Sequence, residues 1–157
     1  YKRQAQSAQP IISYNFGQQN PVRVARTIRL ALKTALGCGI FFFAATLVFN
    51  HQIVGLFIDK SYQAYDIAVN GIPYFAVGYL FFALNIVGIG YYQSIERARR
   101  ATVITLFRGT LFMLAGFLLL PPVLGVRGIW LAVPLAELLT LLLIIGIYLK
   151  DSFAVRR

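Results

Sequence analysis

Four long blocks of apolar residues, separated by short polar stretches, dominate the pattern along this chain. The blocks cover residues 30–49, 67–92, 102–124 and 128–149. Each is about long enough to cross the roughly 30 Å hydrocarbon core of a bilayer as an α-helix. A helix of a soluble bundle would carry a polar stripe along one side, and these blocks carry none. The pattern therefore predicts an all-α membrane protein with four transmembrane helices.

The basic residues alternate across the predicted membrane. Ten of them lie before or at the start of span one, between spans two and three, or after span four: Arg23, Arg26, Arg29, Lys33, Arg97, Arg99, Arg100, Lys150, Arg156 and Arg157. The opposite connections hold only Lys60 and Arg127. This bias places the 94–101 loop and the C-terminus in the cytoplasm, in a multi-pass protein of the inner (plasma) membrane. A nucleic-acid surface would not keep this alternation, so the net charge of +10 indicates the lipid bilayer as partner and excludes nucleic acid.

The segment before span one divides into two parts. Residues 1–20 turn apolar and then break at Asn15 and Gly17, which is typical of a helix C-terminus, here the end of a preceding helix with its cytoplasmic turn. Residues 21–33 interleave apolar side chains with cations. This second pattern predicts a helix that lies along the cytoplasmic interface before the chain enters the membrane, and residues 21–157 then form one transmembrane unit.

One face of span two combines aromatic, small and polar residues. Its members follow one another at intervals of three or four: Tyr74, Gly78, Phe81, Asn85, Gly88 and Tyr92. That spacing aligns them along one side of a helix. The face suits a cavity for flat lipophilic cations, held by apolar and cation–π contacts. The alternative is packing on a neighbouring helix, with Asn85 bonded to a backbone carbonyl across the interface.

Two ionisable residues lie inside spans. Arg108 is about a turn and a half into span three, and Glu137 is near the middle of span four. A charge near the middle of a span costs at least roughly 2.5–3.5 kcal/mol, so the Glu137 side chain should face protein or water. Three roles remain open for Glu137: a hydrogen bond within the helix bundle, a pair with Arg108, or proton exchange with a cavity. A vertical offset of roughly 9 Å, from helical rise, puts Arg108 at the edge of reach.

The residue inventory argues against catalysis. His51 is the only histidine and Cys38 the only cysteine, which excludes a paired-histidine haem, a multi-histidine metal site or an internal disulfide within these residues. No Ser–His–acid set or phosphate-binding loop occurs, so we expect no enzyme, no metal and no organic cofactor. The sequence begins at Tyr1 and its one methionine is Met113, so we expect it to belong to a longer protein.

Four phrases together resemble the multidrug and toxic compound extrusion (MATE) transporters. QPIISYNFGQQN is similar to the phrase that ends the second helix of each lobe, with Gln9, Pro10, Asn15 and Gly17 as its motif residues. The others are VFNHQIVGLFIDKSYQAYDIA in an external connection, YYQSIERARRA in a cytoplasmic return, and GVRGIWLAVPLAE at the start of the last helix. They occur in the family's order and spacing, so the resemblance covers roughly residues 9–149.

The resemblance implies the last third of a twelve-helix, two-lobed transporter. Residues 1–20 would end helix eight, and residues 21–157 would be helices nine to twelve of the C-terminal lobe. The implied activity is export of drugs or organic cations by antiport with H⁺ or Na⁺, and the implied partners are small amphipathic or cationic substrates and the N-terminal lobe. Where some members carry an acidic residue in helix ten, this chain has Asn85. The resemblance favours the cavity role for the span-two face and a structural role for Glu137.

Two rival functions differ in what they require of the spans. A lipid-linked saccharide flippase of related architecture should carry more basic residues inside its helices to hold pyrophosphate. A non-transporting membrane anchor subunit should carry histidines in mid-span for haem or quinone. Arg108 is the only basic residue well inside a span and His51 lies at a span's edge, which favours neither rival.

Overall fold

Helices make up nearly all of residues 8–155, the part of the chain described by the computed structural model. In chain order they are α2 (Ala8–Gly17), α3 (Pro21–Val48), α4 (Asn50–Gly55), α5 (Gln63–Ala76), α6 (Gly78–Ser94), α7 (Ala98–Leu106), the π-helical segment η1 (Phe107–Phe112), α8 (Met113–Leu124) and α9 (Val126–Val155). Three helical stretches of the described part are long and apolar enough to span a membrane, namely α3, the continuous run α7–η1–α8 and α9, and the bent pair α5–α6 is a fourth when it is counted as one span. The predicted all-α membrane class is confirmed.

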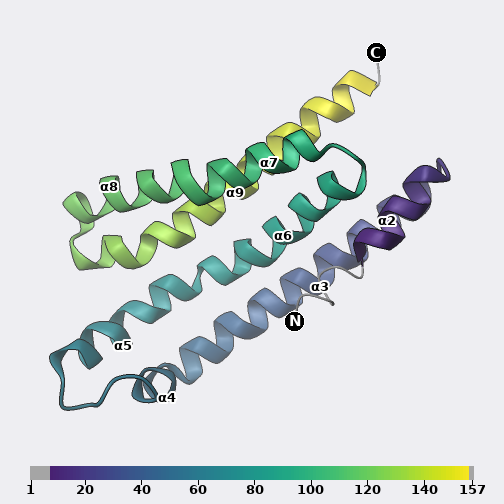
Figure 1. The fold of residues 1–157 in the computed structure, drawn as a ribbon. Coiled ribbons are helices and arrows are strands. Elements are labelled where there is room, and N and C mark those ends of the chain that lie inside the picture. The colour runs from purple at the N-terminus through teal and green to yellow at the C-terminus, as the bar shows by residue number, and fades with distance from the viewer. Residues whose placement is uncertain (1–7, 156–157) are drawn as a thin grey trace.

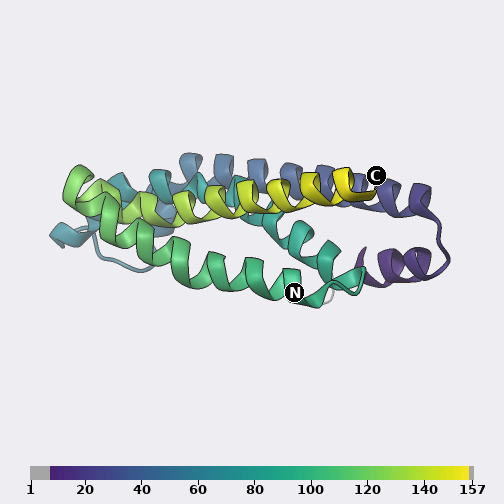
Figure 2. The ribbon, with the colours of Figure 1, turned by 90° about the horizontal axis from the view of Figure 1, so that it is seen from above.

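The long helices lie side by side in an order that differs from the chain order. Figure 1 shows α9 between α6 and α8, with α3 beyond α6. Both views place α2, the α6–α7 connection and the C-terminal end of α9 at one end of the bundle (Figures 1 and 2). The other end holds α4 and the α8–α9 turn. The connections rich in basic residues therefore gather at the same end.

Helix α3 corrects one prediction from the sequence. It runs for 28 residues from Pro21 to Val48 without a break, so the separate interfacial helix over residues 21–33 is wrong. Asn20 starts the helix, since its side chain accepts a hydrogen bond from the Arg23 amide at 3.1 Å, and Pro21 suits the first turn. No proline follows to interrupt the hydrogen-bond ladder. The cations accordingly lie on the first turns of the spanning helix itself.

The second apolar block folds as two helices rather than one. Helices α5 and α6 meet at Val77 with a bend of 42°. Pro73 lies one turn before the break and Gly78 directly after it. Proline lacks the amide that would bond to Val69, and glycine weakens a helix, so both residues favour a break in this region. The bend changes the direction of the face that carries the aromatic residues.

The third block contains a π-helical segment that its sequence did not predict. Helices α7 and α8 are joined by η1 without leaving helical geometry. A π-helical turn holds one residue more than an α-helical turn, and such segments are frequent at functional sites. Arg108 is the second residue of η1. The segment therefore places the one arginine that lies deep in this span.

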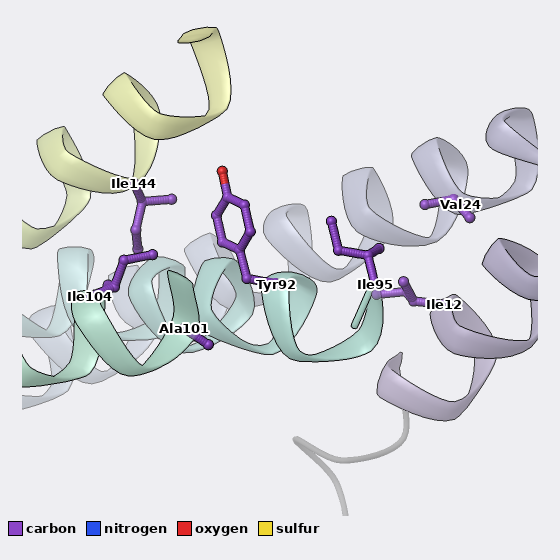
Figure 3. Packing of buried hydrophobic residues seen from close by; sticks show 7 residues of the cluster. All are labelled: Ile12, Val24, Tyr92, Ile95, Ala101, Ile104 and Ile144. Carbon is purple, nitrogen blue, oxygen red and sulfur yellow. The ribbon is translucent and has the colours of Figure 1, made fainter. Parts of the chain in front are cut away.

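Two apolar clusters hold the ends of the bundle. The larger joins α2, α3, α6, α7 and α9 at the end that carries α2, and it is shown in Figure 3: Ile12, Val24, Tyr92, Ile95, Ala101, Ile104 and Ile144. The smaller joins α4 to α5 at the opposite end through Val54, Tyr65 and Val69. At the α8–α9 turn the two helices approach closely, since a Cβ at Gly128 would lie 2.4 Å from the Leu120 carbonyl oxygen.

Candidate functional site

A polar network lies at the centre of the bundle, where α6 faces α9. Asn85 is fully buried and Glu137 is 5% exposed. The Asn85 side-chain amide donates to the Glu137 backbone carbonyl and to Oε2 of its carboxylate, both at 2.8 Å. Because a buried amide or carboxylate without partners is costly, these contacts tie α6 to α9 at a fixed register.

Arg108 enters the same network from η1. Its Nε lies 3.0 and 3.1 Å from the two carboxylate oxygens of Glu137, and its Nη2 lies 2.8 Å from Oε1. The guanidinium also lies over the Phe82 ring, 4.8 Å from its centroid. The side chains of Arg108 and Glu137 are 20% and 7% exposed. Forked contacts of this kind are among the strongest hydrogen bonds in proteins, so the network joins η1 to both other helices.

The network brings together two of the roles left open for Glu137. Its carboxylate is hydrogen-bonded inside the bundle, by Asn85, and it is also paired with Arg108. The long arginine side chain covers the offset that helical rise alone placed at the edge of reach. The pair leaves no net charge at the site when both groups are ionised, which lowers the cost of holding them in a membrane. Proton exchange at Glu137 is the third alternative and stays untested.

Three residues of the predicted span-two face contact α9. A Cβ at Gly78 would lie 3.5 Å from Pro134, and one at Gly88 would lie 3.0 Å from Ile144. Asn85 bonds to Glu137 as described above. These contacts are the packing arrangement that the sequence left open as the alternative. The assignment of this face to a substrate cavity stays a prediction.

The other members of that face have different surroundings. Tyr74 and Phe81 are half-buried. Tyr92 is 1% exposed within the larger apolar cluster, and its hydroxyl has no hydrogen-bond partner among the described residues. The rings therefore do not gather at one place. Tyr92 belongs to the end of the bundle that carries α2, and Tyr74 lies on α5 just before the bend.

The motif at residues 9–17 connects α2 to the end of α6. The Gln9 side-chain amide donates to the side-chain carbonyl of Gln93 at 3.0 Å, and the Ser13 hydroxyl donates to the Ser94 carbonyl at 3.0 Å. Asn15 is 6% exposed and its amide donates to the Ile11 carbonyl within α2. Pro10 and Gly17 are exposed. The motif thus fixes where one helix ends against another.

Sequence reasoning missed an ion-pair cluster at the same end. Asp151 on α9 pairs with Arg97, at 2.5 Å, and with Arg100. Tyr91 and Tyr148 stack edge to face nearby, with ring centroids 6.4 Å apart. Together these contacts join the α6–α7 connection to the last turns of α9. The signal was present in the sequence, since Asp151 is the only acidic residue in the basic C-terminal segment.

The opposite end of the bundle carries two polar residues, Asp59 and His51. The Ser61 backbone amide and hydroxyl donate to the Asp59 carboxylate at 2.9 and 2.8 Å, and these bonds lower the pKa of Asp59 below its usual value. His51 Nδ1 lies 3.3 Å from the Tyr65 hydroxyl. Among the described residues, no three His, Cys, Asp or Glu side chains gather into a metal-binding group.

Two hollows adjoin these features. A cavity of about 410 Å³ lies between α5–α6, η1 and α9, and the Arg108–Glu137 pair forms part of its wall. We call it the lateral pocket. A larger hollow of about 1480 Å³ lies between α2, α3, α6 and α9, with Leu36, Tyr91 and Ile145 among its lining residues. The three aromatic residues of the lateral pocket, Phe75, Tyr79 and Phe82, were not predicted as site residues, since they lie beside the face that the spacing selected.

Comparisons with known proteins agree on one family. The sequence profile of the MatE family matches residues 5–118. Among solved structures, the fold matches an inward-facing multidrug resistance MATE family transporter of the MOP superfamily with a TM-score of 0.83 and 17% identity over 88% of this chain and 32% of that one. It matches an outward-facing multidrug resistance MATE family transporter with a TM-score of 0.86 and 15% identity, covering 98% and 35%.

A third structure, of MATE in complex with MaL6, matches with a TM-score of 0.83 and 14% identity over 98% of this chain and 35% of that one. At these identities the likeness concerns the fold. The chain spans about a third of the length of the structures it matches, 32% to 35%. A search among curated proteins found no match.

Proposed function

The chain belongs to the MatE family, and from this membership we propose that the complete protein is a secondary active transporter. Its cargo would be drugs or organic cations, exported in exchange for H⁺ or Na⁺. The observation that carries the proposal is the family match over residues 5–118, together with a fold shared along nearly the whole chain with multidrug resistance transporters. We propose no enzymatic activity, since this is a family of transporters.

The described helices would form part of the C-terminal lobe. The chain covers 35% of the outward-facing transporter it resembles, so the remaining helices, including the N-terminal lobe, would be its partner within one protein. An inward-facing and an outward-facing transporter structure match this fold with TM-scores of 0.83 and 0.86. This supports a rocking exchange in which these four spans move together as one body. The protein would lie in the inner (plasma) membrane with its C-terminus in the cytoplasm.

The network at Glu137 bears on ion coupling. Its two carboxylate oxygens already accept from Arg108 and Asn85, and a coupling acid must instead be free to exchange its ion with a cavity. We therefore assign Glu137 to holding the helices together. We place the coupling residue in the part of the protein that lies outside these 157 residues.

A transport assay on the complete protein tests the proposal. Proteoliposomes are loaded so that either a pH gradient or a sodium gradient can be imposed, and movement of ethidium is followed by fluorescence. We expect transport that one of the two gradients drives and that collapsing this gradient abolishes. Liposomes without protein provide the control. Folded, correctly inserted protein that moves no organic cation under either gradient would contradict the proposal.

A further inference from the structure

The lateral pocket has the size and lining of a small-molecule site. Its volume of about 410 Å³ falls within the roughly 300–1,000 Å³ of ligand pockets in general. Three aromatic side chains from the bent pair α5–α6 line it: Phe75, Tyr79 and Phe82. Opposite them, Arg108 and Glu137 supply the charged part of the wall. An apolar chamber with one polar corner suits an amphipathic molecule.

The unused hydrogen-bonding capacity of that corner is on the donor side. A carboxylate offers about four acceptor positions, and the Glu137 oxygens receive three contacts from Arg108 and one from Asn85. A guanidinium has five N–H groups, yet Arg108 uses only Nε and Nη2, and none of the described residues accepts from its Nη1. Because Nη1 has no partner among these residues and is not a buried atom, it keeps some accessible surface.

We propose that the lateral pocket binds an amphipathic molecule through a hydrogen-bond-accepting group placed on the free edge of Arg108. The accepting group is a carboxylate, phosphate, ester or carbonyl, and the apolar body lies among the three rings. Glu137 acts as a positioning residue, because it holds the guanidinium in a fixed plane. An organic cation is disfavoured at this corner, since the carboxylate that would attract it is already saturated.

Two sources can supply such a molecule, because a membrane lipid and a free aromatic acid share this chemistry. All residues that line the pocket belong to the described spans, and the proposal concerns binding there rather than transport. Binding is measured without an ion gradient, and its failure leaves the transport proposal untouched. A failure of transport likewise leaves this binding proposal untouched.

Glycine positions allow the pocket to be filled without disturbing the fold. Gly109 lines the pocket, and a Cβ built there meets nothing within 4 Å. Gly109→Leu should therefore occupy the chamber from η1. Gly146 on α9 is equally open but lines neither hollow, so Gly146→Leu is the matched control. Arg108→Lys keeps the positive charge but removes the free guanidinium edge.

The probes are 4-(1-pyrenyl)butyrate and the matched 4-(1-pyrenyl)butyl-trimethylammonium, which share one aromatic body and differ in the charged group. Each is titrated into the complete protein in dodecyl maltoside, and binding is followed by fluorescence anisotropy with protein-free micelles subtracted. We expect the butyrate to bind at least tenfold more tightly than the ammonium probe. Gly109→Leu and Arg108→Lys should each weaken butyrate binding by about tenfold or more. Gly146→Leu should leave it within about twofold.

Competition then separates the two sources. Dihexanoyl-phosphatidylglycerol stands for the lipid and 2-naphthoate for a free aromatic acid, and the one that displaces the butyrate at the lower concentration identifies the source. Equal binding by Gly109→Leu and Gly146→Leu would show that the pocket is not the site. Equal affinity for the two probes, or no displacement by either competitor, would refute recognition of an accepting group.

Discussion

The stability losses from breaking the Arg108–Glu137 pair at either partner should not add when both partners are replaced. Arg108→Met leaves the Glu137 carboxylate, 7% exposed at its side chain, with only the Asn85 amide as partner. An uncompensated buried charge of this kind costs about 3–5 kcal/mol. Glu137→Gln preserves the shape and one acceptor, and the partly exposed guanidinium can reach polar surroundings. We expect that variant to lose about 1–3 kcal/mol.

The double variant tests whether the two side chains act as a unit. With Arg108→Met and Glu137→Gln together, no charge remains, and the amide introduced on α9 can still pair with Asn85. The loss in the free energy of unfolding should therefore be at least about 2 kcal/mol smaller than the sum of the two single losses. Unfolding of the complete protein by sodium dodecyl sulfate in mixed micelles, followed by circular dichroism, gives the free energies. Arg99→Met, on the exposed first turn of α7, is the control and should change stability by no more than about 0.5 kcal/mol. Single losses that add within about 0.5 kcal/mol would refute the reasoning.

Three further predictions concern packing, topology and assembly. Gly116→Ala should destabilise the protein by about 1–3 kcal/mol, because the new Cβ would lie 2.8 Å from the Ala132 carbonyl oxygen, whereas Gly37→Ala meets open space and should be neutral in the same unfolding assay. Cysteines introduced at Lys60 and at Arg97 should react with impermeant maleimide from opposite sides of the membrane, and labelling of both from one side would contradict the four-span topology. Vesicles that contain only the 157-residue chain should not accumulate ethidium under a pH gradient, and accumulation would show that four spans suffice.

The sequence predicted the spans because bilayer thickness dictates their length and apolar character. It predicted less of what happens inside each span. The bend after Pro73 had a visible cause, yet nothing in Phe107–Phe112 distinguishes a π-helical segment from an α-helix before the neighbours are in place. The unbroken α3 was missed for a different reason, since cations interleaved with apolar residues favour an interfacial helix and the start of a span equally.

The sequence predicted the polar residues of the candidate site but not their partners or the aromatic rings beside them. Glu137, Arg108 and Asn85 stood out because polar groups in hydrocarbon need partners, but which partner each one finds depends on helix order across the bundle. Chain order makes α6 and α7 neighbours, whereas α9 lies between α6 and α8. The rings of the lateral pocket were missed because a spacing argument selects one face, and the pocket lies where two faces meet.

The extra residue in η1 sets the rotational phase of the helix that follows it. Ile104 is fully buried on the α7 side and Gly116 packs against α9 on the α8 side. In an uninterrupted α-helix, twelve residues would turn these two positions about 120° apart, and one absorbed residue brings them to within about 20°. Deleting Gly109 should therefore restore an uninterrupted α-helix and leave Gly116 facing α9, because eleven α-helical residues also separate the two positions by about 20°. Away from η1, by contrast, one residue gained or lost would turn the rest of the span by about 100°.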